Sequence, residues 1–301
     1  MKAKIFNFLK NYLHIIILSG ILAVICWYAM PGQLFNDPLS TVVYDRDGVL
    51  IGARIASDGQ WRFPPPDSLP EKVQQAIITF EDQYFYLHPG INLLSIGRAF
   101  LQNIVAGEII SGGSTISMQV VRLSRRGKPR NIFQKVIESI LSVRYELTHR
   151  KADILIDYAA NAPFGGNVVG IEAASWRYFG TSPENLTYGE SALLAVLPNA
   201  PSLIHPGKNR ELLKQKRNRL LLKMTEKNII DSITYILACS EPLPGAPEPL
   251  PDLVPHVTDR LLTVEGKGRQ YFTTISSVLQ SRVNEITDLH NERLSENQIH
   301  N

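Results

Sequence analysis

The hydrophobic pattern starts with one long apolar run near the N-terminus. Residues 13–31 are apolar apart from two isolated polar positions, and Pro31 ends the run. As a helix, such a run covers roughly 27 Å at about 1.5 Å per residue, close to the thickness of a bilayer core. Lysines precede the run and aspartates follow it. The sequence therefore predicts a cytoplasmic tail over residues 1–12 and a single-pass transmembrane anchor over residues 13–31. A cleaved signal peptide is the alternative.

Beyond this run, the pattern changes from that of strands to that of helices. Residues 38–66 alternate weakly between apolar and polar positions around a turn sequence at 45–48, which predicts a short β region with a hairpin. From residue 67 onward, apolar positions recur three and four apart. Capping sequences at Ser68 and Thr187 predict two helix starts. Further helical patterns cover residues 114–124, 131–149 and 151–161.

Proline separates the helical part from the C-terminal part. Residues 241–255 are rich in proline, which predicts a semi-rigid linker. The following segment, residues 256–301, is too short to be an independent domain. The sequence thus predicts a mostly α fold, with one helical domain over residues 67–240.

Composition and charge narrow the class of protein only slightly. The chain has 301 residues, of which 44% are hydrophobic, enough for a substantial core, and its net charge is +3. So small a charge gives no reason to expect nucleic acid as a partner. Cys26 lies in the apolar run and Cys239 lies far from it, so neither a disulfide framework nor a cysteine-based zinc site is expected.

The candidate chemistry is concentrated in residues 81–90, whose sequence is Glu-Asp-Gln-Tyr-Phe-Tyr-Leu-His-Pro-Gly. Glu81 lies at the border of an apolar helical stripe, where partial burial raises the pKa of a carboxyl group toward that of a working base. Taken alone, Glu81 and Asp82 would more often be a solvated or helix-capping pair. A second glutamate, Glu138, shares a helical stripe with Lys135, where a surface ion pair is the ordinary interpretation.

Two further features suit a phosphorylated ligand. Gly113, Ser114 and Thr115 open a predicted helix whose unpaired backbone N–H groups favour an anion, although a plain helix cap is the alternative. A basic run then predicts contact with phosphate or anionic lipid, with a solvated basic loop as the alternative. This run consists of Arg122, Arg125, Arg126, Lys128 and Arg130.

Together these stretches resemble a known family. Residues 81–90 match the first motif of glycosyltransferase family 51, the peptidoglycan glycosyltransferases of class A penicillin-binding proteins, and four further motifs follow in the family's order. These are residues 112–116 with Gln119, Lys135 with Glu138, residues 154–158 with Asn161, and residues 197–201 with Arg217. The resemblance covers about residues 40–240 and, through Met118, Gln119, Val120 and Arg122, is greatest to the 1C type of these proteins.

The resemblance implies a fold, an activity and a location. The fold would be a lysozyme-like glycosyltransferase head with a small membrane-associated jaw over residues 91–110. The activity would be the polymerisation of lipid II, a disaccharide-pentapeptide on undecaprenyl pyrophosphate, into β-1,4-linked glycan strands with inversion. The partners would be lipid II, the growing glycan chain, the membrane and other cell-wall synthesis proteins. The location would be the bacterial inner membrane, with a periplasmic catalytic domain.

The resemblance also implies roles for particular residues. Glu81 would be the catalytic base, and Glu138 would position the departing pyrophosphate, with or without a divalent cation such as Mg²⁺ or Mn²⁺. No nucleotide cofactor is needed, because the lipid already activates the sugar. The substrate-binding residues would be Asp82, Phe85, His88, Gly113, Ser114, Thr115, Gln119, Arg122, Lys135 and Asn161.

The sequence departs from the family pattern at three places. Arg122 stands where most members have Lys, and Gln134 stands where an Arg usually precedes Lys135. Residues 256–301 resemble only the start of a transpeptidase domain, and no S-x-x-K sequence occurs in these 301 residues, so no transpeptidase activity is expected. Two alternatives stay open: a catalytically idle copy that acts as a membrane scaffold, and a lytic, lysozyme-like hydrolase.

Overall fold

The structure is a computed structural model that describes residues 12–13, 17–21, 24, 27–28, 34–106, 113–125, 131–199, 209–245 and 247–296. Most of the predicted anchor over residues 13–31 lies outside the described residues, as does the tail up to residue 11. Within the part of the chain that the structure describes, no helix combines the length and the apolar character needed to cross a membrane. The anchor therefore stays a prediction.

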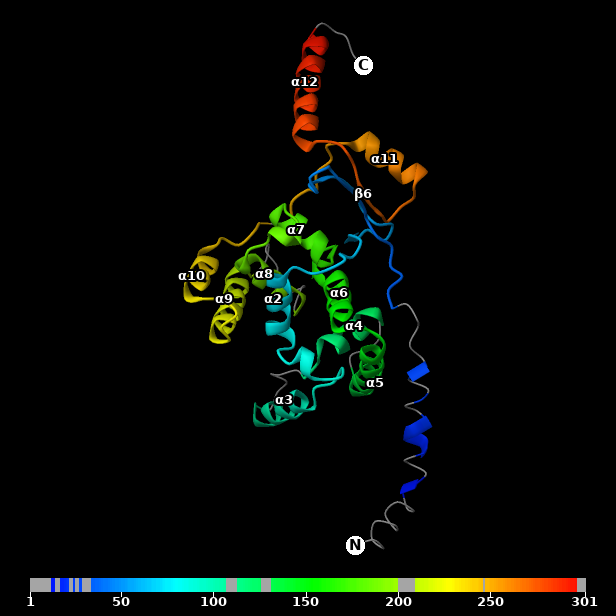
Figure 1. Cartoon of the computed structure of the whole chain (residues 1–301), viewed down its shortest axis with the longest axis vertical. Helices are drawn as coiled ribbons and strands as arrows, with labels where there is room; N and C mark the ends of the chain where they lie inside the picture. Colours follow the sequence, from blue (N-terminus) through cyan, green and yellow to red (C-terminus); the bar gives the residue numbers. More distant parts are fainter. Residues whose placement is uncertain are drawn as a thin grey trace. The chain divides into compact units, whose positions relative to one another are not determined.

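The described chain is mostly helical, which confirms the predicted class of fold (Figure 1). The helices are α2 (Glu71–Glu81), α3 (Leu93–Ala106), α4 (Ile116–Ser124), α5 (Ile132–Thr148), α6 (Lys151–Asn161), α7 (Ile171–Phe179), α8 (Tyr188–Val196), α9 (Arg210–Glu226), α10 (Ser232–Ser240), α11 (Pro255–Val264) and α12 (Ser277–Glu296). Short 3-10 turns are η1 (Phe85–Leu87), η2 (Pro183–Asn185) and η3 (Leu197–Asn199). The strands are β1 (Thr41–Tyr44), β2 (Leu50–Arg54), β3 (Trp61–Arg62), β4 (Pro163–Gly165), β5 (Val168–Val169) and β6 (Gln270–Phe272).

The chain divides into two compact units. The first contains residues 1–36 and 81–158, and the second contains residues 37–80 and 159–301. Helices α3, α4 and α5 belong to the first unit, whereas both sheets and α7 to α12 belong to the second. The helical domain predicted over residues 67–240 therefore contributes to both units.

Asparagine, threonine and aspartate side chains explain where several helices begin. Thr187 and Glu190 form the predicted capping box at the start of α8, because each side chain accepts from the other's backbone N–H. The predicted cap at Ser68 is wrong, since α2 begins at Glu71 and the carbonyl group of Pro70 accepts from Gln74 N–H at 3.0 Å. Pro70 disfavours the helical conformation of the residue before it, Leu69, so the helix begins after the proline.

The β region of the second unit contains a pairing that periodicity does not reveal. β1 and β2 form the predicted antiparallel hairpin, and its turn is fixed by Asp45, whose Oδ1 accepts from the N–H groups of Asp47 and Val49 at 2.8 Å. Strand β6 from the C-terminal segment then pairs with β1 in parallel, giving the order β2-β1-β6. The segment after the proline-rich linker thus completes the sheet of the N-terminal hairpin.

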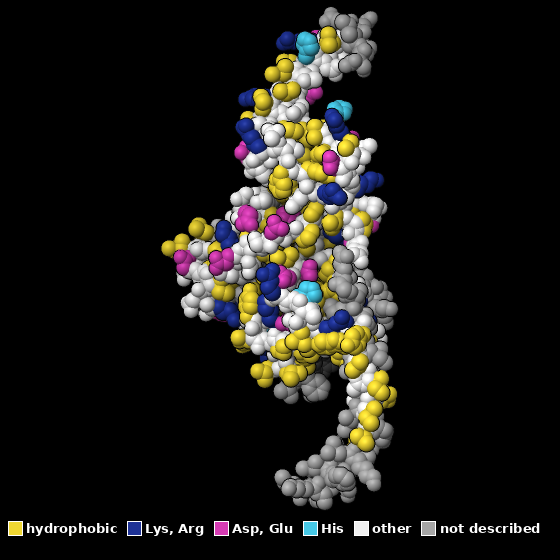
Figure 2. Space-filling view, turned by 45° about the vertical axis from the view of Figure 1, so that its right-hand side comes forward, with side chains coloured by type: hydrophobic (Ala, Val, Ile, Leu, Met, Phe, Trp, Pro, Cys, Tyr) yellow, Lys and Arg dark blue, Asp and Glu magenta, His cyan; other side chains and the backbone are white. Residues whose placement is uncertain are grey.

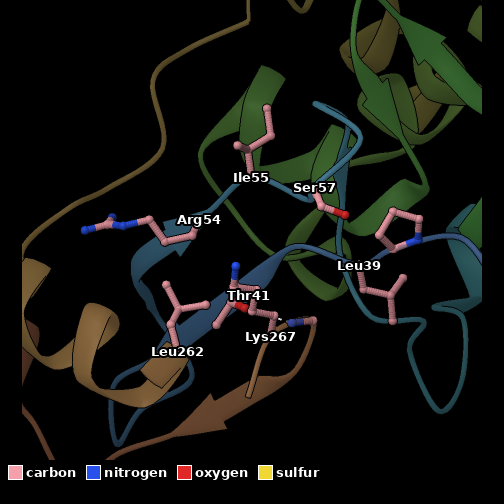
Figure 3. A pocket seen from close by; sticks show the side chains of 9 residues that line it. Leu39, Thr41, Arg54, Ile55, Ser57, Leu262 and Lys267 are labelled. Carbon is pink, nitrogen blue, oxygen red and sulfur yellow. Dashed lines mark hydrogen bonds between the residues drawn. The ribbon is translucent and has the colours of Figure 1, made fainter. Parts of the chain in front are cut away.

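A pocket of about 310 Å³ lies beside this sheet (Figure 3). Its lining consists of Pro38, Leu39, Thr41, Arg54, Ile55, Ser57, Leu262, Lys267 and Gly268. The Arg54 side chain extends away from the other labelled residues and pairs with Asp252 at 2.9 Å and with Asp259 at 3.0 Å. The second cation of the lining is Lys267. In the described part of the chain, it forms no ion pair with a carboxylate.

A buried arginine side chain joins two helices of the second unit. Arg217 of α9 is 1% exposed, and its guanidinium group donates to the carbonyl oxygens of Glu241 at 2.8 Å and Cys239 at 2.9 Å. These carbonyls belong to the end of α10, where a helix leaves backbone acceptors without internal partners. Arg217 therefore acts as a side-chain cap that attaches α10 to α9.

Replacement of Arg217 by Met should lower the free energy of unfolding by about 2–3 kcal/mol, because buried carbonyl groups lose a charged donor. Urea unfolding followed by circular dichroism measures this change. The matched control is Arg219→Met on the exposed side of the same helix, which should change stability by less than about 0.5 kcal/mol. Equal stability of the two variants would contradict the capping role.

Candidate active site

Glu81 is the last residue of α2, and its carboxylate is held from two sides. Gln119 Nε2 donates to Glu81 Oε2 at 2.6 Å, and the Tyr158 hydroxyl group donates to Glu81 Oε1 at 3.3 Å. Gln119 Oε1 in turn accepts from Arg122 at 3.2 Å. Side chains from α4 and α6 thus meet at one partly buried carboxylate.

The surroundings of Glu81 act on its pKa in opposite directions. Burial raises the pKa of Glu81, and the neighbouring carboxyl group of Asp82 raises it further. The hydrogen bonds from Gln119 and Tyr158 and the charge of Arg122 lower it, but the net change is upward. A carboxyl group whose pKa is raised toward neutrality is a better proton acceptor than an ordinary glutamate, so this environment suits a general base.

The loop that follows Glu81 is stabilised by contacts of three of its own side chains, those of Asp82, Phe85 and His88. His88 Nε2 lies 2.9 Å from Asp82 Oδ2, and the two side chains are 7% and 5% exposed. The same oxygen of Asp82 accepts from the backbone N–H of Ile116 at 3.2 Å, which ties the loop to the start of α4. Phe85 is fully buried, with the ammonium group of Lys151 at 4.4 Å from its ring centroid. Contact of these three side chains with substrate stays a prediction.

The end of this loop is joined to two helices through Gly90. The Thr115 hydroxyl group donates to the carbonyl oxygen of Gly90 at 2.6 Å and accepts from Met118 N–H at 3.2 Å, so it also caps α4. The Ser142 hydroxyl group of α5 shares its one hydrogen between the same carbonyl oxygen, at 3.2 Å, and the carbonyl oxygen of Ser139, at 2.8 Å. Gly90 has a φ of +91°, and a Cβ atom there would lie 2.6 Å from the backbone oxygen of Ser142. Glycine is therefore required at this position by both conformation and space.

The predicted anion site at the start of α4 offers fewer free backbone N–H groups than the sequence suggests. Gly113 is buried, and a Cβ atom there would lie 2.7 Å from the Cα atom of Ile96, whereas Ser114 is partly exposed. Two N-terminal amides of the helix are already bonded, Ile116 N–H to Asp82 and Met118 N–H to Thr115. Fewer amides are therefore free for a ligand than an unmodified helix N-terminus would offer.

The remaining predicted site residues that the structure describes lie on α5 and at the end of α6. Lys135 is exposed and Glu138 partly buried, one turn apart on α5, which packs against α4. Asn161 belongs to the second unit, whereas Glu81 belongs to the first. The basic residues Arg126, Lys128 and Arg130 lie outside the described residues.

The described residues offer no ready metal site. Nowhere in the described ranges do three or more His, Cys, Asp or Glu side chains come together in a group that could hold a metal ion. A divalent cation at Glu138 stays a prediction.

A partly buried ion pair that the sequence pattern does not reveal joins helices of the first unit. Glu146 Oε2 lies 2.5 Å from Lys151 Nζ, and Lys151 also donates to the carbonyl oxygen of His88 at 2.8 Å. Ser117 of α4 donates to the other oxygen of Glu146. The pair spans the break between α5 and α6, where helical spacing gives no signal. Tyr158 was missed as a site residue as well, although it lies in the fourth motif.

Fold and site first define a class: a mostly helical protein whose candidate catalytic group is a partly buried carboxylate base. The comparison with protein families then gives the family. The model of the family described as Transglycosylase matches residues 48–225, more than half of the chain, and the chain therefore belongs to this family.

Individual relatives agree with this membership. Penicillin-binding protein 1C of Escherichia coli is 37% identical over 246 residues, which are 81% of this chain and 32% of that protein. Penicillin-binding protein 1A of Aquifex aeolicus is 35% identical over 211 residues, 70% of this chain and 29% of that protein. The chain spans about a third of the length of these relatives. The crystal structure of penicillin-binding protein 1A from Haemophilus influenzae aligns with a TM-score of 0.38 and 19% identity, over 81% of this chain and 28% of that one.

Replacement of Gly90 by Ala should lower the free energy of unfolding by at least about 2 kcal/mol, because the added Cβ atom meets the Ser142 backbone. Thermal and urea unfolding measure this loss. Gly48→Ala is the matched control, since Gly48 has a φ of +78° but open space around it. It should show only the conformational cost of about 1–2 kcal/mol. If Gly90→Ala costs no more than Gly48→Ala, the close approach has no energetic role.

Proposed function

We propose that this chain is a peptidoglycan glycosyltransferase that polymerises lipid II into β-1,4-linked glycan strands and releases undecaprenyl pyrophosphate. The observation that carries the proposal is the environment of Glu81: burial raises its pKa while side-chain donors hold the carboxylate in place. Membership of the transglycosylase family supports the same activity. Because the chain spans about a third of its relatives, the proposal is restricted to glycosyl transfer.

In the proposed reaction, Glu81 accepts the proton of the 4-hydroxyl group of the incoming lipid II. The oxygen of that group attacks the anomeric carbon of the growing chain, and the bond from this carbon to the pyrophosphate breaks. The pyrophosphate leaves with the bonding electrons. Attack from the opposite face converts an α linkage into a β linkage, so the reaction inverts. A hydrolase would use water in place of the hydroxyl group, and its product would be shortened glycan instead of polymer.

Cationic and hydroxyl groups would offset the charge on the departing pyrophosphate. Arg122 lies close enough to Glu81 to act on its pKa, so a positive charge is present beside the base. Lys135 is exposed on α5 and Ser114 is partly exposed before α4, and we assign both to the pyrophosphate. Glu138, one turn after Lys135, would orient this group.

An exposed apolar surface supports action at a membrane. Leu87, Leu93 and Leu94, here called the leucine patch, are 80%, 76% and 87% exposed. They line a pocket of about 510 Å³ that also includes His88 and Arg98. Figure 2 shows hydrophobic side chains gathered on the lower part of the molecular surface that it presents. Large apolar side chains grouped in this way favour contact with lipid, and we assign the patch to the inner membrane from which lipid II is taken.

Glu81→Gln should reduce polymerisation at least about a hundredfold, the usual contribution of a general base, while leaving the fold intact. Fluorescent lipid II and a gel that separates glycan polymers measure the activity, and circular dichroism reports the fold. Glu71→Gln, at the exposed start of the same helix, is the matched control and should retain activity. Near-normal polymer from folded Glu81→Gln protein would remove Glu81 as the base. Shortened glycan from the unmodified protein would favour the hydrolase.

The leucine patch should direct the protein to lipid independently of the predicted anchor. Burial of three leucine side chains favours membrane binding by several kcal/mol, at about 1.5–3 kcal/mol each. Protein lacking residues 1–31 should therefore float with anionic liposomes, less strongly at high salt because cations such as Arg98 contribute. The triple change of the patch to Ser should abolish flotation and reduce activity.

The matched control for the patch uses α10, where Ile233, Ile236 and Leu237 are 70%, 64% and 61% exposed. Replacing these three residues by Ser removes the same kind of apolar surface from the second unit and should leave flotation unchanged. If both triple variants float equally well, the leucine patch does not bind the membrane.

A further inference from the structure

We propose that Tyr158 is a positioning residue for Glu81: with Gln119, it places one hydrogen-bond donor on each oxygen of the catalytic carboxylate. This inference deepens the proposed function and rests on Glu81 being the base. Tyr158 lies on α6, nearly eighty positions from Glu81 in the chain, and the hydrogen bond between them joins two separate helices.

Each oxygen of the Glu81 carboxylate accepts a hydrogen bond from a different side chain. Gln119 donates to Oε2 at 2.6 Å and Tyr158 donates to Oε1 at 3.3 Å, so neither oxygen is left to rotate freely. The amide of Gln119 is itself oriented, because its oxygen accepts from Arg122 at 3.2 Å. An ionised carboxylate has about four lone-pair sites, so one donor on each oxygen leaves others for the proton of the substrate hydroxyl group.

Tyr158 acts as a permanent donor and not as a second base. Its side chain is 2% exposed, and burial together with the adjacent Glu81 raises its pKa well above the ordinary value. The hydroxyl group therefore stays protonated at any pH at which the protein works. A tyrosine in this environment can supply a hydrogen bond to Glu81 but cannot take a proton from the substrate.

The electrostatic effect of Tyr158 follows from the other groups that face Glu81. Burial and Asp82 favour the protonated form of the carboxyl group, whereas Gln119, Tyr158 and Arg122 favour the ionised form. Loss of the Tyr158 hydroxyl group removes one of the opposing donors. The pKa of Glu81 should then rise further, and a larger share of the enzyme should hold a protonated, inactive base at low pH.

The test compares pH profiles of polymerisation by the full chain with fluorescent lipid II. In Tyr158→Phe, the acid limb of kcat/KM should move upward by about one pH unit, since a hydrogen bond to a charged group is lost. Activity should thus fall about tenfold on the acid limb and recover at alkaline pH. Gln119→Glu removes the other donor and adds a like charge, so its acid limb should move upward further.

Tyr145→Phe is the matched control. Tyr145 is another buried tyrosine of the first unit, and its hydroxyl group donates to Asp157 instead of Glu81. Its loss should reduce thermal stability without moving the acid limb. A merely structural role for Tyr158 predicts the same behaviour in both tyrosine variants: lower activity at every pH and no recovery at alkaline pH.

The outcomes separate this inference from the proposed function. Residual high activity of Glu81→Gln would reject the base itself, whatever Tyr158 does. An inactive Glu81→Gln together with an unmoved acid limb in Tyr158→Phe would reject only the positioning role. If Tyr158→Phe proves unstable, the pH profile of Gln119→Glu replaces it as the test. An unmoved acid limb in Gln119→Glu would contradict the inference that the two donors set the pKa of Glu81.

Discussion

The carbonyl group of Gly90 is the point on which the arrangement of the first unit depends. The hydroxyl groups of Thr115 and Ser142 both donate to its oxygen, and the missing side chain lets the backbone of α5 approach closely. Because Thr115 begins α4 and Ser142 lies within α5, one carbonyl group fixes the loop after Glu81 against both helices. The position of Gln119, one turn further along α4, follows from this junction.

As the proposed base, Glu81 must satisfy two requirements that oppose each other. Burial raises the proton affinity of Glu81, which helps it to take a proton, but too much burial would leave it protonated before substrate arrives. Donors from two helices offset part of the burial. The partly buried pair of Glu146 and Lys151 connects α5, α6 and the loop at His88, and so helps to fix the helices that carry these donors.

Local chemistry was predictable from the sequence, whereas long-range pairing was not. The hairpin at Asp45 and the capping box at Thr187 depend on residues within a few positions, and both were found as predicted. Ser68 does not cap α2, because Pro70 disfavours a helical conformation at Leu69 and the helix begins only at Glu71. Glu81 was identified from its apolar stripe and the family motif. Its bond to Tyr158 joins separate helices, and no spacing rule connects positions so far apart.

The sheet completed by β6 has a consequence for the order of events during biosynthesis. Gly268 N–H donates to Thr41 Oγ1 across 227 positions, and the whole of β6 pairs with a strand that is among the first to be made. At about 5–20 residues per second, a ribosome needs on the order of ten to fifty seconds to reach the partner segment. During that time one edge of β1 lacks its native strand, and exposed edges invite pairing with other chains. Until β6 is made, protection of this edge of the hairpin, for example by a chaperone, limits such pairing.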